Sequence, residues 1–366
     1  MKGERCPPQS ILIVKLSAIG DVIQTLPMLK ALRRRFPGAR IDWLVEEDAA
    51  GILQGFPGLD SVLVSRRKSW QKGIGQKGKI RATMSEMIHF VHTLREREYD
   101  WVIDSHGVLK SGVLVALSRG RQKIGYQASA GIADEGNYLF TNERYKPLSI
   151  ERHALERYLD LVAQLGVPIA DVPFEYPIAE DFLTAARKRL EQYEFGRHPC
   201  VILHPVAKWE TKQWPAENFA QLADLLVERR AGVVMTGSPQ DAKPVETILG
   251  MTRHSANILN LTGKTCLREL AGLFSLSDLV ITPDTGPMHL AAAVKAPLIA
   301  LFGPTAPWRT GPYGNGPTIL RKELSCSPCF KKKCGTRECM QGITVEEVLN
   351  AAEEKIRQKG ERNGSE

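Results

Sequence analysis

The sequence lacks any apolar run long enough to cross a bilayer. The stretch from Ala291 to Phe302 is interrupted by Lys295 and Pro297 and spans about a dozen residues, where a transmembrane helix needs about 20. The opening, MKGERCPPQS, is polar, and the apolar run that follows it is stopped by Lys15, so a signal peptide is not expected. We therefore expect a protein that is soluble or at most peripheral on a membrane.

Cysteine is scarce outside one segment, which does not fit the disulfide scaffold of a small secreted protein. Four of the seven cysteines form a C-x2-C-x4-C-x4-C pattern and three are isolated: Cys326, Cys329, Cys334 and Cys339, then Cys6, Cys200 and Cys266. Four thiolates suffice for tetrahedral zinc, and the lysines beside them favour the thiolate form. The compact spacing lacks standard finger geometry, so we favour structural or redox-sensitive thiols, with structural zinc and an iron–sulfur site as alternatives.

The length and composition indicate a globular protein with one large or two ordinary domains. The chain has 366 residues, of which 43% are hydrophobic and 25% charged, and these values exclude a disordered or collagen-like chain. Lys and Arg outnumber Asp and Glu by 49 to 41, giving a net charge of +8. The excess predicts an anionic partner, and phosphorylated sugars, anionic lipids and nucleic acids all remain open at this point.

A basic stretch between Asp60 and Glu86 contains glycine and no acidic residue, and we expect it to be a flexible loop. It is either a solvated loop or a loop that grips an anion or faces a membrane. Trp70 is its only aromatic residue, so no platform for stacking bases is evident and no nucleic-acid partner is expected. Its basic residues are Arg66, Arg67, Lys68, Lys72, Lys77, Lys79 and Arg81.

Short β-branched runs alternate with longer amphipathic segments, a pattern typical of an α/β fold with a parallel sheet covered by helices. Strands are expected at Ile11–Leu16, Ile41–Val45, Ser61–Val64 and Trp101–Ser105, and again at Cys200–His204, Val233–Thr236, Ile258–Leu261, Leu279–Thr282 and Leu298–Phe302. Helices are expected at Val22–Arg35, Met84–Glu98, Val108–Ser118, His153–Leu165, Ala216–Arg229, Lys243–Gly250, Leu267–Ser275 and Met288–Val294. Residues 359–366 resemble a frayed polar tail.

A linker is expected at 166–177, where the chain carries glycine and three prolines and restarts no strand. The predicted domains are therefore 1–175 and 176–366. Two doubly wound, Rossmann-like halves generate a cleft between the carboxyl ends of their sheets, the favoured place for nucleotides and their conjugates.

Asp21 lies in a short loop, Ser17–Asp21, between the first strand and the first helix. It caps the helix amino terminus, or it is an ionised carboxylate that takes a proton from an incoming hydroxyl. The loop lacks the motifs G-x-G-x-x-G and G-x-x-x-x-G-K-[ST]. A dinucleotide-binding site or a phosphate-binding P-loop is therefore less expected here.

Two strand-end segments of the second half could bind an anion. In Thr282–His289, the Thr285 hydroxyl, the Gly286 N–H and the helix terminus form a candidate phosphate site, with His289 as a further donor. Asp284 either caps the helix or accepts hydrogen bonds from sugar hydroxyls. In the loop 204–215, Lys208 and Lys212 either reach a diphosphate or are solvated. If they reach it, their positive charge would stabilise the phosphate as it departs.

Three motifs in order resemble the ADP-heptose lipopolysaccharide heptosyltransferases, glycosyltransferase family 9. They are ILIVKLSAIGDVIQTLP at 11–27, KQWP at 212–215 and DTGPMHLAAA at 284–293. The resemblance implies a GT-B fold whose two domains face an interdomain cleft. It also implies inverting transfer without a catalytic metal, donor binding mainly by the second domain, and a cytoplasmic enzyme peripheral on the inner face of the cytoplasmic membrane.

The resemblance also assigns roles residue by residue. Asp21 corresponds to the candidate general base, and Lys212 to the lysine that contacts the donor's phosphate and sugar. Asp284 corresponds to the acid that binds heptose hydroxyls. The diphosphate site corresponds to Thr285, Gly286 and His289, and our candidates for binding the acceptor are Ser17, Gly20, Arg66, Arg67, Lys68, His106 and Lys110.

The acceptor is predicted from mixed features. DSHGVLKS at 104–111 and ERHA at 151–154 resemble heptosyltransferase I, which adds heptose to Kdo on lipid A, although His106 replaces an expected glutamine. The Cys-rich tail resembles heptosyltransferase II, which adds a second heptose. We favour Kdo. The alternatives are transfer of another sugar or to another acceptor, a nucleotide-sugar epimerase whose signature residues we do not find, and a zinc-dependent nucleic-acid-binding protein.

Overall fold

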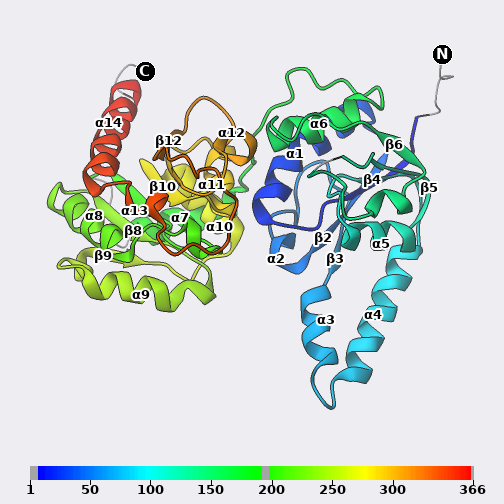
Figure 1. Cartoon of the computed structure of the whole chain (residues 1–366), viewed down its shortest axis with the longest axis horizontal. Coiled ribbons are helices and arrows are strands. Elements are labelled where there is room, and N and C mark those ends of the chain that lie inside the picture. The colour runs from blue at the N-terminus through cyan, green and yellow to red at the C-terminus, as the bar shows by residue number, and fades with distance from the viewer. Residues whose placement is uncertain (1–6, 130, 192–197, 364–366) are drawn as a thin grey trace. The chain divides into compact units, whose positions relative to one another are not determined.

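The chain folds into two compact units, Met1–Phe174 and Glu175–Glu366. The structure is a computed structural model that describes residues 7–129, 131–191 and 198–363. Cys6, most of the polar opening segment and the end of the predicted tail lie outside these residues. Each unit contains one six-stranded sheet with helices packed against it (Figure 1).

In the first unit, every pair of neighbouring strands is parallel, in the order β3-β2-β1-β4-β5-β6. The strands are β1 (Ser10–Val14), β2 (Arg40–Glu46), β3 (Ser61–Ser65), β4 (Glu98–Asp104), β5 (Arg119–Tyr126) and β6 (Glu143–Tyr145). The helices are α1 (Ile19–Arg35), α2 (Glu47–Ala50), α3 (Arg67–Ile74), α4 (Ile80–Arg95), α5 (Leu109–Leu117), the 3₁₀ helix η1 (Asn137–Phe140) and α6 (Ala154–Ala163).

The second unit repeats this topology, because its order β12-β11-β10-β7-β8-β9 is the same 3-2-1-4-5-6 arrangement traversed from the other edge. Its strands are β7 (Cys200–Leu203), β8 (Gly232–Met235), β9 (Ile258–Asn260), β10 (Leu279–Pro283), β11 (Leu298–Phe302) and β12 (Thr318–Arg321). Its longer helices are α7 (Glu180–Glu191), α8 (Ala216–Glu228), α9 (Ala242–Met251), α10 (Leu267–Leu276), α11 (Gly286–Ala293) and α14 (Val345–Asn363). Its short helices are η3 (Glu210–Lys212), η4 (Pro239–Asp241), η5 (Ser255–Asn257), α12 (Pro307–Thr310) and α13 (Glu338–Gln341).

The central strands form the cores. Ile11 to Val14 of β1 and Leu298 to Phe302 of β11 have no exposed surface, as expected for parallel strands covered on both faces. In this topology the chain reverses its winding between β1 and β4 and between β7 and β10. Loops at the carboxyl ends of those strand pairs are where doubly wound folds bind ligands. The fold therefore offers one candidate site in each unit.

Two sequence expectations are wrong. The basic stretch is not a loop: it contains α3 and the start of α4, and its glycines are concentrated at the connection, where Gly78 has a φ of +91°. The helix α3 forms because Trp70 is buried against Phe90 of α4, with ring centroids 5.1 Å apart. The tail is also helical as far as Asn363, and 364–366 lie outside the described residues.

No helix within the described parts of the chain combines the length and the apolar character that crossing a membrane requires.

Candidate active site

Asp21 lies at the winding reversal of the first unit, in the first turn of α1 just beyond β1. Its side chain is partly exposed and accepts two hydrogen bonds. The Ala18 N–H donates to Oδ2 over 3.0 Å, so Asp21 does cap the helix, and the Tyr158 hydroxyl of α6 donates to Oδ1 over 3.0 Å. Each carboxylate oxygen has a second lone pair, so capping leaves Asp21 able to accept a further proton or hydrogen bond.

A buried lysine supplies positive charge near this carboxylate. Lys15 is 3% exposed, donates from Nζ to the Ser105 carbonyl over 3.2 Å, and lies 3.9 Å from the centre of the Tyr158 ring. Burial lowers the pKa of Lys15 to about 8, although the charges of Asp21 and Asp104 oppose that shift. Lys15 is therefore mostly cationic at neutral pH.

The pKa of Asp21 lies below its ordinary value. Burial opposes ionisation, but the Lys15 charge, the Ala18 N–H and the Tyr158 hydroxyl together outweigh it. The pKa of Tyr158 is raised well above its ordinary value, first by burial and then by Asp21, so the phenol keeps its proton. The site thus holds an ionised carboxylate beside a neutral hydrogen-bond donor.

His106 is neutral in this environment. Burial and the neighbouring charges of Lys15 and Lys110 lower its pKa to about 2, and its Nδ1 is buried without a hydrogen-bond partner among the described residues. Asp104 is fully buried and accepts bonds from the backbone N–H groups of His106 and Gly107, each over 3.1 Å. Gly107, at a φ of +75°, permits the turn that brings these groups to Asp104. His106 is therefore held as a neutral polar group.

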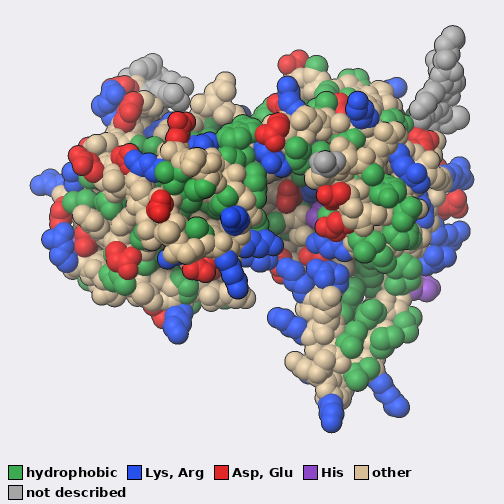
Figure 2. Space-filling view, viewed as in Figure 1, with side chains coloured by type: hydrophobic (Ala, Val, Ile, Leu, Met, Phe, Trp, Pro, Cys, Tyr) green, Lys and Arg blue, Asp and Glu red, His purple; other side chains and the backbone are tan. Residues whose placement is uncertain are grey.

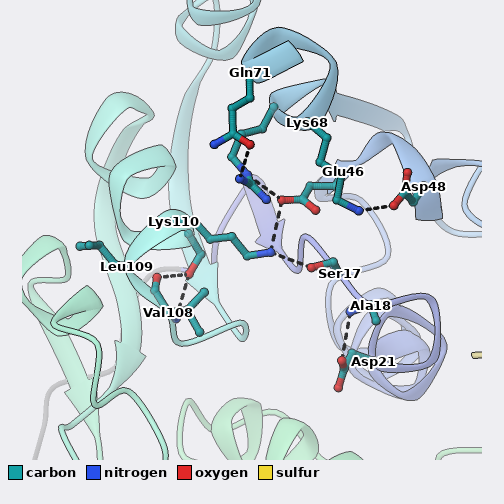
Figure 3. A network of polar contacts seen from close by, with 12 residues as sticks. Ser17, Ala18, Asp21, Glu46, Asp48, Lys68, Gln71, Val108, Leu109 and Lys110 are labelled. Carbon is teal, nitrogen blue, oxygen red and sulfur yellow. Dashed lines mark hydrogen bonds and ion pairs between the residues drawn. The ribbon is translucent and has the colours of Figure 1, made fainter. Parts of the chain in front are cut away.

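Several acceptor candidates belong to one ionic network (Figure 3). Lys110 donates to the Ser17 hydroxyl over 2.7 Å and to Glu46 over 3.2 Å, and Arg67 pairs with the same Glu46 carboxylate at 3.0 Å. Lys68 pairs with Asp48. The structure therefore joins Ser17, Lys110 and the first turn of α3 through Glu46 at the end of β2, while Asp48 of α2 holds Lys68.

The remaining acceptor candidates differ in accessibility. Gly20 is buried in the first turn of α1. Arg66 is exposed and contacts Glu47 at 3.7 Å and Glu86 at 3.5 Å. These positions give Gly20 a backbone role and leave Arg66 open to solvent.

The second unit brings Lys212 and Asp284 together at its own winding reversal. Lys212 follows β7 and Asp284 follows β10, and their Nζ and Oδ2 atoms are 2.6 Å apart. The Thr305 hydroxyl donates to the same Asp284 oxygen over 2.7 Å, and the Lys212 ammonium lies 4.5 Å from the centre of the Trp209 ring. Lys208, in the same loop, is exposed. Asp284 is thus neutralised by direct contact, which suits ligand binding better than proton transfer.

The amino terminus of α11 is the candidate phosphate site. Thr285 is the N-cap residue, with its hydroxyl accepting from the Met288 N–H over 3.4 Å, and Gly286 begins the helix. The terminus leaves N–H groups and a positive dipole end for an anion. His289 lies one turn further along α11 and is 6% exposed. Any hydrogen bond that it donates to a bound phosphate would therefore come from a buried side chain.

The cysteine cluster lies beside Thr211, in the loop that carries Lys212. Cys326, Cys329, Cys334 and Cys339 are free thiols that line one small pocket. Across the described chain, no group of three or more His, Cys, Asp or Glu residues is placed to hold a metal ion, so the geometry gives zinc no support. The segment is anchored by backbone bonds from Cys329 and Phe330 to Pro304, and its Lys331 carbonyl accepts from the Thr211 hydroxyl. It therefore braces the loop that carries Lys212.

Sequence reasoning missed three residues of the two sites: Lys15, Tyr158 and Thr305. Lys15 lies in the motif at 11–27, but nothing in that motif indicates that its ammonium is buried. Tyr158 and Thr305 reach their carboxylates only through the tertiary fold, and no sequence signal singled them out.

Comparison with known proteins identifies close relatives. Residues 87–340 match the sequence profile of Glycosyltransferase family 9 (heptosyltransferase). A Pseudomonas aeruginosa protein named lipopolysaccharide heptosyltransferase 1 is 32% identical over 330 residues, covering 88% of this chain and 87% of that protein.

Two solved structures share the architecture. Escherichia coli heptosyltransferase WaaC with ADP-2-deoxy-2-fluoro heptose has a TM-score of 0.73 and 26% identity, covering 94% of this chain and 99% of that one. Escherichia coli ADP-heptose lipopolysaccharide heptosyltransferase II has a TM-score of 0.75 and 23% identity, and the match covers 96% of this chain and 99% of that one. With the two parallel six-stranded sheets, these similarities confirm the predicted α/β GT-B class.

Proposed function

The chain belongs to glycosyltransferase family 9, the heptosyltransferases, and from this premise we propose that it transfers heptose from ADP-heptose to Kdo in the inner core of lipopolysaccharide. The observation that carries the proposal is that the first unit has an ionised carboxylate, Asp21, at its winding reversal and the second unit has a cationic anion site at its own. The first is suited to activate a hydroxyl, and the second to hold a nucleotide diphosphate.

Asp21 acts as the general base. An acceptor hydroxyl attacks the anomeric carbon of heptose from the face opposite ADP, and Asp21 removes the hydroxyl proton as the new C–O bond forms. A carboxylate of low pKa is a weak base, so transfer late in bond formation, when the attacking oxygen is most acidic, suits it. One such displacement inverts the anomeric configuration.

The second unit stabilises the leaving group. Lys212 and the amino terminus of α11, with Thr285, Gly286 and His289, offset the negative charge that grows on the diphosphate as the C–O bond breaks. Asp284 accepts hydrogen bonds from heptose hydroxyls while remaining paired with Lys212. The reaction in this proposal needs no cofactor besides the nucleotide-sugar donor.

Kdo is the proposed acceptor because two features favour it. The motifs at 104–111 and 151–154 resemble heptosyltransferase I, and the Pseudomonas relative carries that name. Lys110 and Arg67, with Arg66 and Lys68 nearby, supply positive charge toward the anionic core, and the Ser17 hydroxyl lies in hydrogen-bond contact with Lys110. Because that acceptor is anchored in lipid A, the proposal places the enzyme at the inner face of the cytoplasmic membrane.

The test is mass spectrometry of Kdo-terminated and heptose–Kdo-terminated acceptors after incubation with ADP-heptose. The proposal predicts one added heptose on the first acceptor and none on the second. Addition only to the second acceptor would make heptose the acceptor, as in heptosyltransferase II. If neither acceptor gains heptose while the protein still binds ADP-heptose, the proposed reaction is refuted. Transfer to another acceptor, or of another sugar, would then be the remaining interpretation.

A further inference from the structure

The helices α3 and α4 form a hairpin with its own packed interior. Trp70 and Phe90 are in contact across it, and the Trp70 indole N–H donates to Glu86 over 3.1 Å. A side chain at Gly73 would collide with the Thr83 hydroxyl, so α3 and α4 approach each other closely near their connection. Figure 1 shows the pair extending away from the sheet of the first unit. The hairpin is therefore a defined protrusion.

One face of this protrusion is apolar and exposed. Ile80, Met84 and Ile88 recur every fourth residue and thus share one face of α4, and they are 48%, 45% and 65% exposed. Ile74, at the end of α3, is 45% exposed. Figure 2 shows hydrophobic side chains gathered along this part of the surface. A row of exposed apolar side chains of this kind marks an interaction surface.

The charges of the hairpin are divided between its base and its tip. At the base, Arg66, Arg67 and Lys68 each contact an acidic side chain. At the tip, within the described residues, no hydrogen bond or ion pair involves the side chains of Lys72, Lys77, Lys79 and Arg81. From 66 to 95 the sequence holds eight Lys and Arg residues and one acidic residue, Glu86. The tip therefore carries uncompensated positive charge beside the apolar row.

We propose that the tip of the α3–α4 hairpin docks on a bilayer of anionic phospholipid, with Ile80, Met84 and Ile88 entering the interface and the tip lysines contacting headgroups. Apolar residues on one helix face with cations at the edge are the combination that binds such surfaces. The inference deepens the proposed function, on which it rests for its purpose, because a docked hairpin holds the enzyme beside a lipid-anchored acceptor.

A protein partner fits these observations less well. The apolar row lies on a protrusion and has Lys77 and Lys79 at its tip end, whereas protein interfaces are depleted in lysine and are built around aromatic anchors and arginine. Trp70 and Phe90, the large aromatic residues of the hairpin, face its interior. A lipid surface requires no such anchors or shape complementarity.

The test is co-sedimentation of the full chain with vesicles that contain no lipopolysaccharide. We expect binding to vesicles of phosphatidylglycerol and phosphatidylethanolamine, at least tenfold weaker binding to phosphatidylcholine, and a decrease as salt rises. Ile88→Glu is expected to weaken binding about tenfold, because a buried isoleucine contributes roughly that factor or more. Its matched control is Met251→Glu, which changes an equally apolar, 46% exposed residue of the second unit without affecting binding.

A double variant, Lys77→Glu with Lys79→Glu, tests the contribution of the tip charges. It is expected to weaken vesicle binding by on the order of 25-fold, because each cation near such a surface contributes a factor of about five. Lys188→Glu with Lys243→Glu, two exposed lysines of the second unit, is the control. Circular dichroism checks that all variants fold.

Two outcomes overturn the docking inference: wild-type protein that ignores anionic vesicles, or Ile88→Glu that binds them as wild type does. Dimerisation that Ile88→Glu abolishes, without vesicle binding, would assign the apolar row to a second copy instead. Turnover of a water-soluble Kdo acceptor is measured in parallel and is expected to be unchanged in the hairpin variants. Vesicle binding by a protein that shows no such turnover would refute the proposed function and leave the docking intact.

Discussion

The two units share a topology but treat their strand-end carboxylates in opposite ways. Asp284 is in direct contact with the Lys212 ammonium at 2.6 Å. Among the described residues, no cation lies within ion-pair distance of Asp21, and its nearest buried cation, Lys15, donates instead to a backbone carbonyl. Asp21 is kept ionised through space, and its oxygens accept only neutral donors.

This difference assigns each carboxylate a separate kind of work. A direct ion pair fixes a carboxylate in position, which suits binding of a polar ligand. A carboxylate stabilised at a distance retains free lone pairs for an incoming hydroxyl. Under the proposed mechanism, the same fold thus provides a proton acceptor in one unit and a binding group in the other.

The largest expected effect comes from removing the proton acceptor. Asp21→Asn should lower kcat by about 10²–10⁴-fold, the usual contribution of a general base, with the Kd for ADP-heptose changed less than twofold. Steady-state kinetics and donor titration measure the two values. Wild-type turnover in this variant would remove Asp21 from its role.

Breaking the direct ion pair should act on binding instead. Lys212→Ala is expected to raise the Kd for ADP-heptose by about 10- to 100-fold, because it removes a charge-assisted contact and leaves Asp284 buried beside the donor without its cation. Titration calorimetry measures the change. Lys322→Ala, which breaks an exposed ion pair with Glu347 in the same unit, is the control and should leave donor affinity unchanged.

The buried cation of the first unit should reveal itself in the pH dependence of stability. Lys15 has a pKa of about 8 in the folded protein against 10.5 in the unfolded chain, so between these values the unfolded chain binds more protons and stability rises with pH. Relative to Lys15→Met, the wild-type protein should gain roughly 2 kcal/mol of unfolding free energy from pH 7.5 to 9.5. Urea denaturation at both pH values checks this, and a parallel pH response in the two proteins would contradict it.

The smallest effect is expected from the neutral donor. Tyr158→Phe removes the hydroxyl that lowers the pKa of Asp21, so that pKa should rise and the acidic limb of the kcat/KM profile should move to higher pH. The expected loss of kcat is about three- to tenfold. Tyr126→Phe is the control, because its hydroxyl donates to the Arg157 carbonyl and not to Asp21. An unmoved acidic limb would show that Tyr158 is only structural.

Much of the fold could be predicted from the sequence, because buried parallel strands are continuous apolar runs and all nine predicted strands are present. The missed strands β5, β6 and β12 lie toward or at the sheet edges and contain polar residues. The sequence predicts a loop where α3 forms, because lysines and glycines are typical of loops, whereas a tertiary contact of Trp70 stabilises the helix.

The family and the strand-end motifs could also be predicted, and the family assignment is confirmed. The electrostatic difference between the two carboxylates could not, because it depends on contacts between distant residues. Tyr158 is 137 residues from Asp21 in the sequence, and Thr305 is 21 from Asp284. Local sequence therefore indicated both candidate sites but not the environment that distinguishes their carboxylates.

The most direct test of the division between the units is single-turnover heptose transfer to the Kdo acceptor at increasing ADP-heptose, with Asp21→Asn and Lys212→Ala side by side. We predict that saturating donor restores part of the rate of Lys212→Ala, the remaining loss being the stabilisation of the leaving diphosphate, and none of the rate of Asp21→Asn. Restoration of Asp21→Asn by donor, or an equal and donor-independent loss in both variants, would contradict the separation of proton transfer from donor binding.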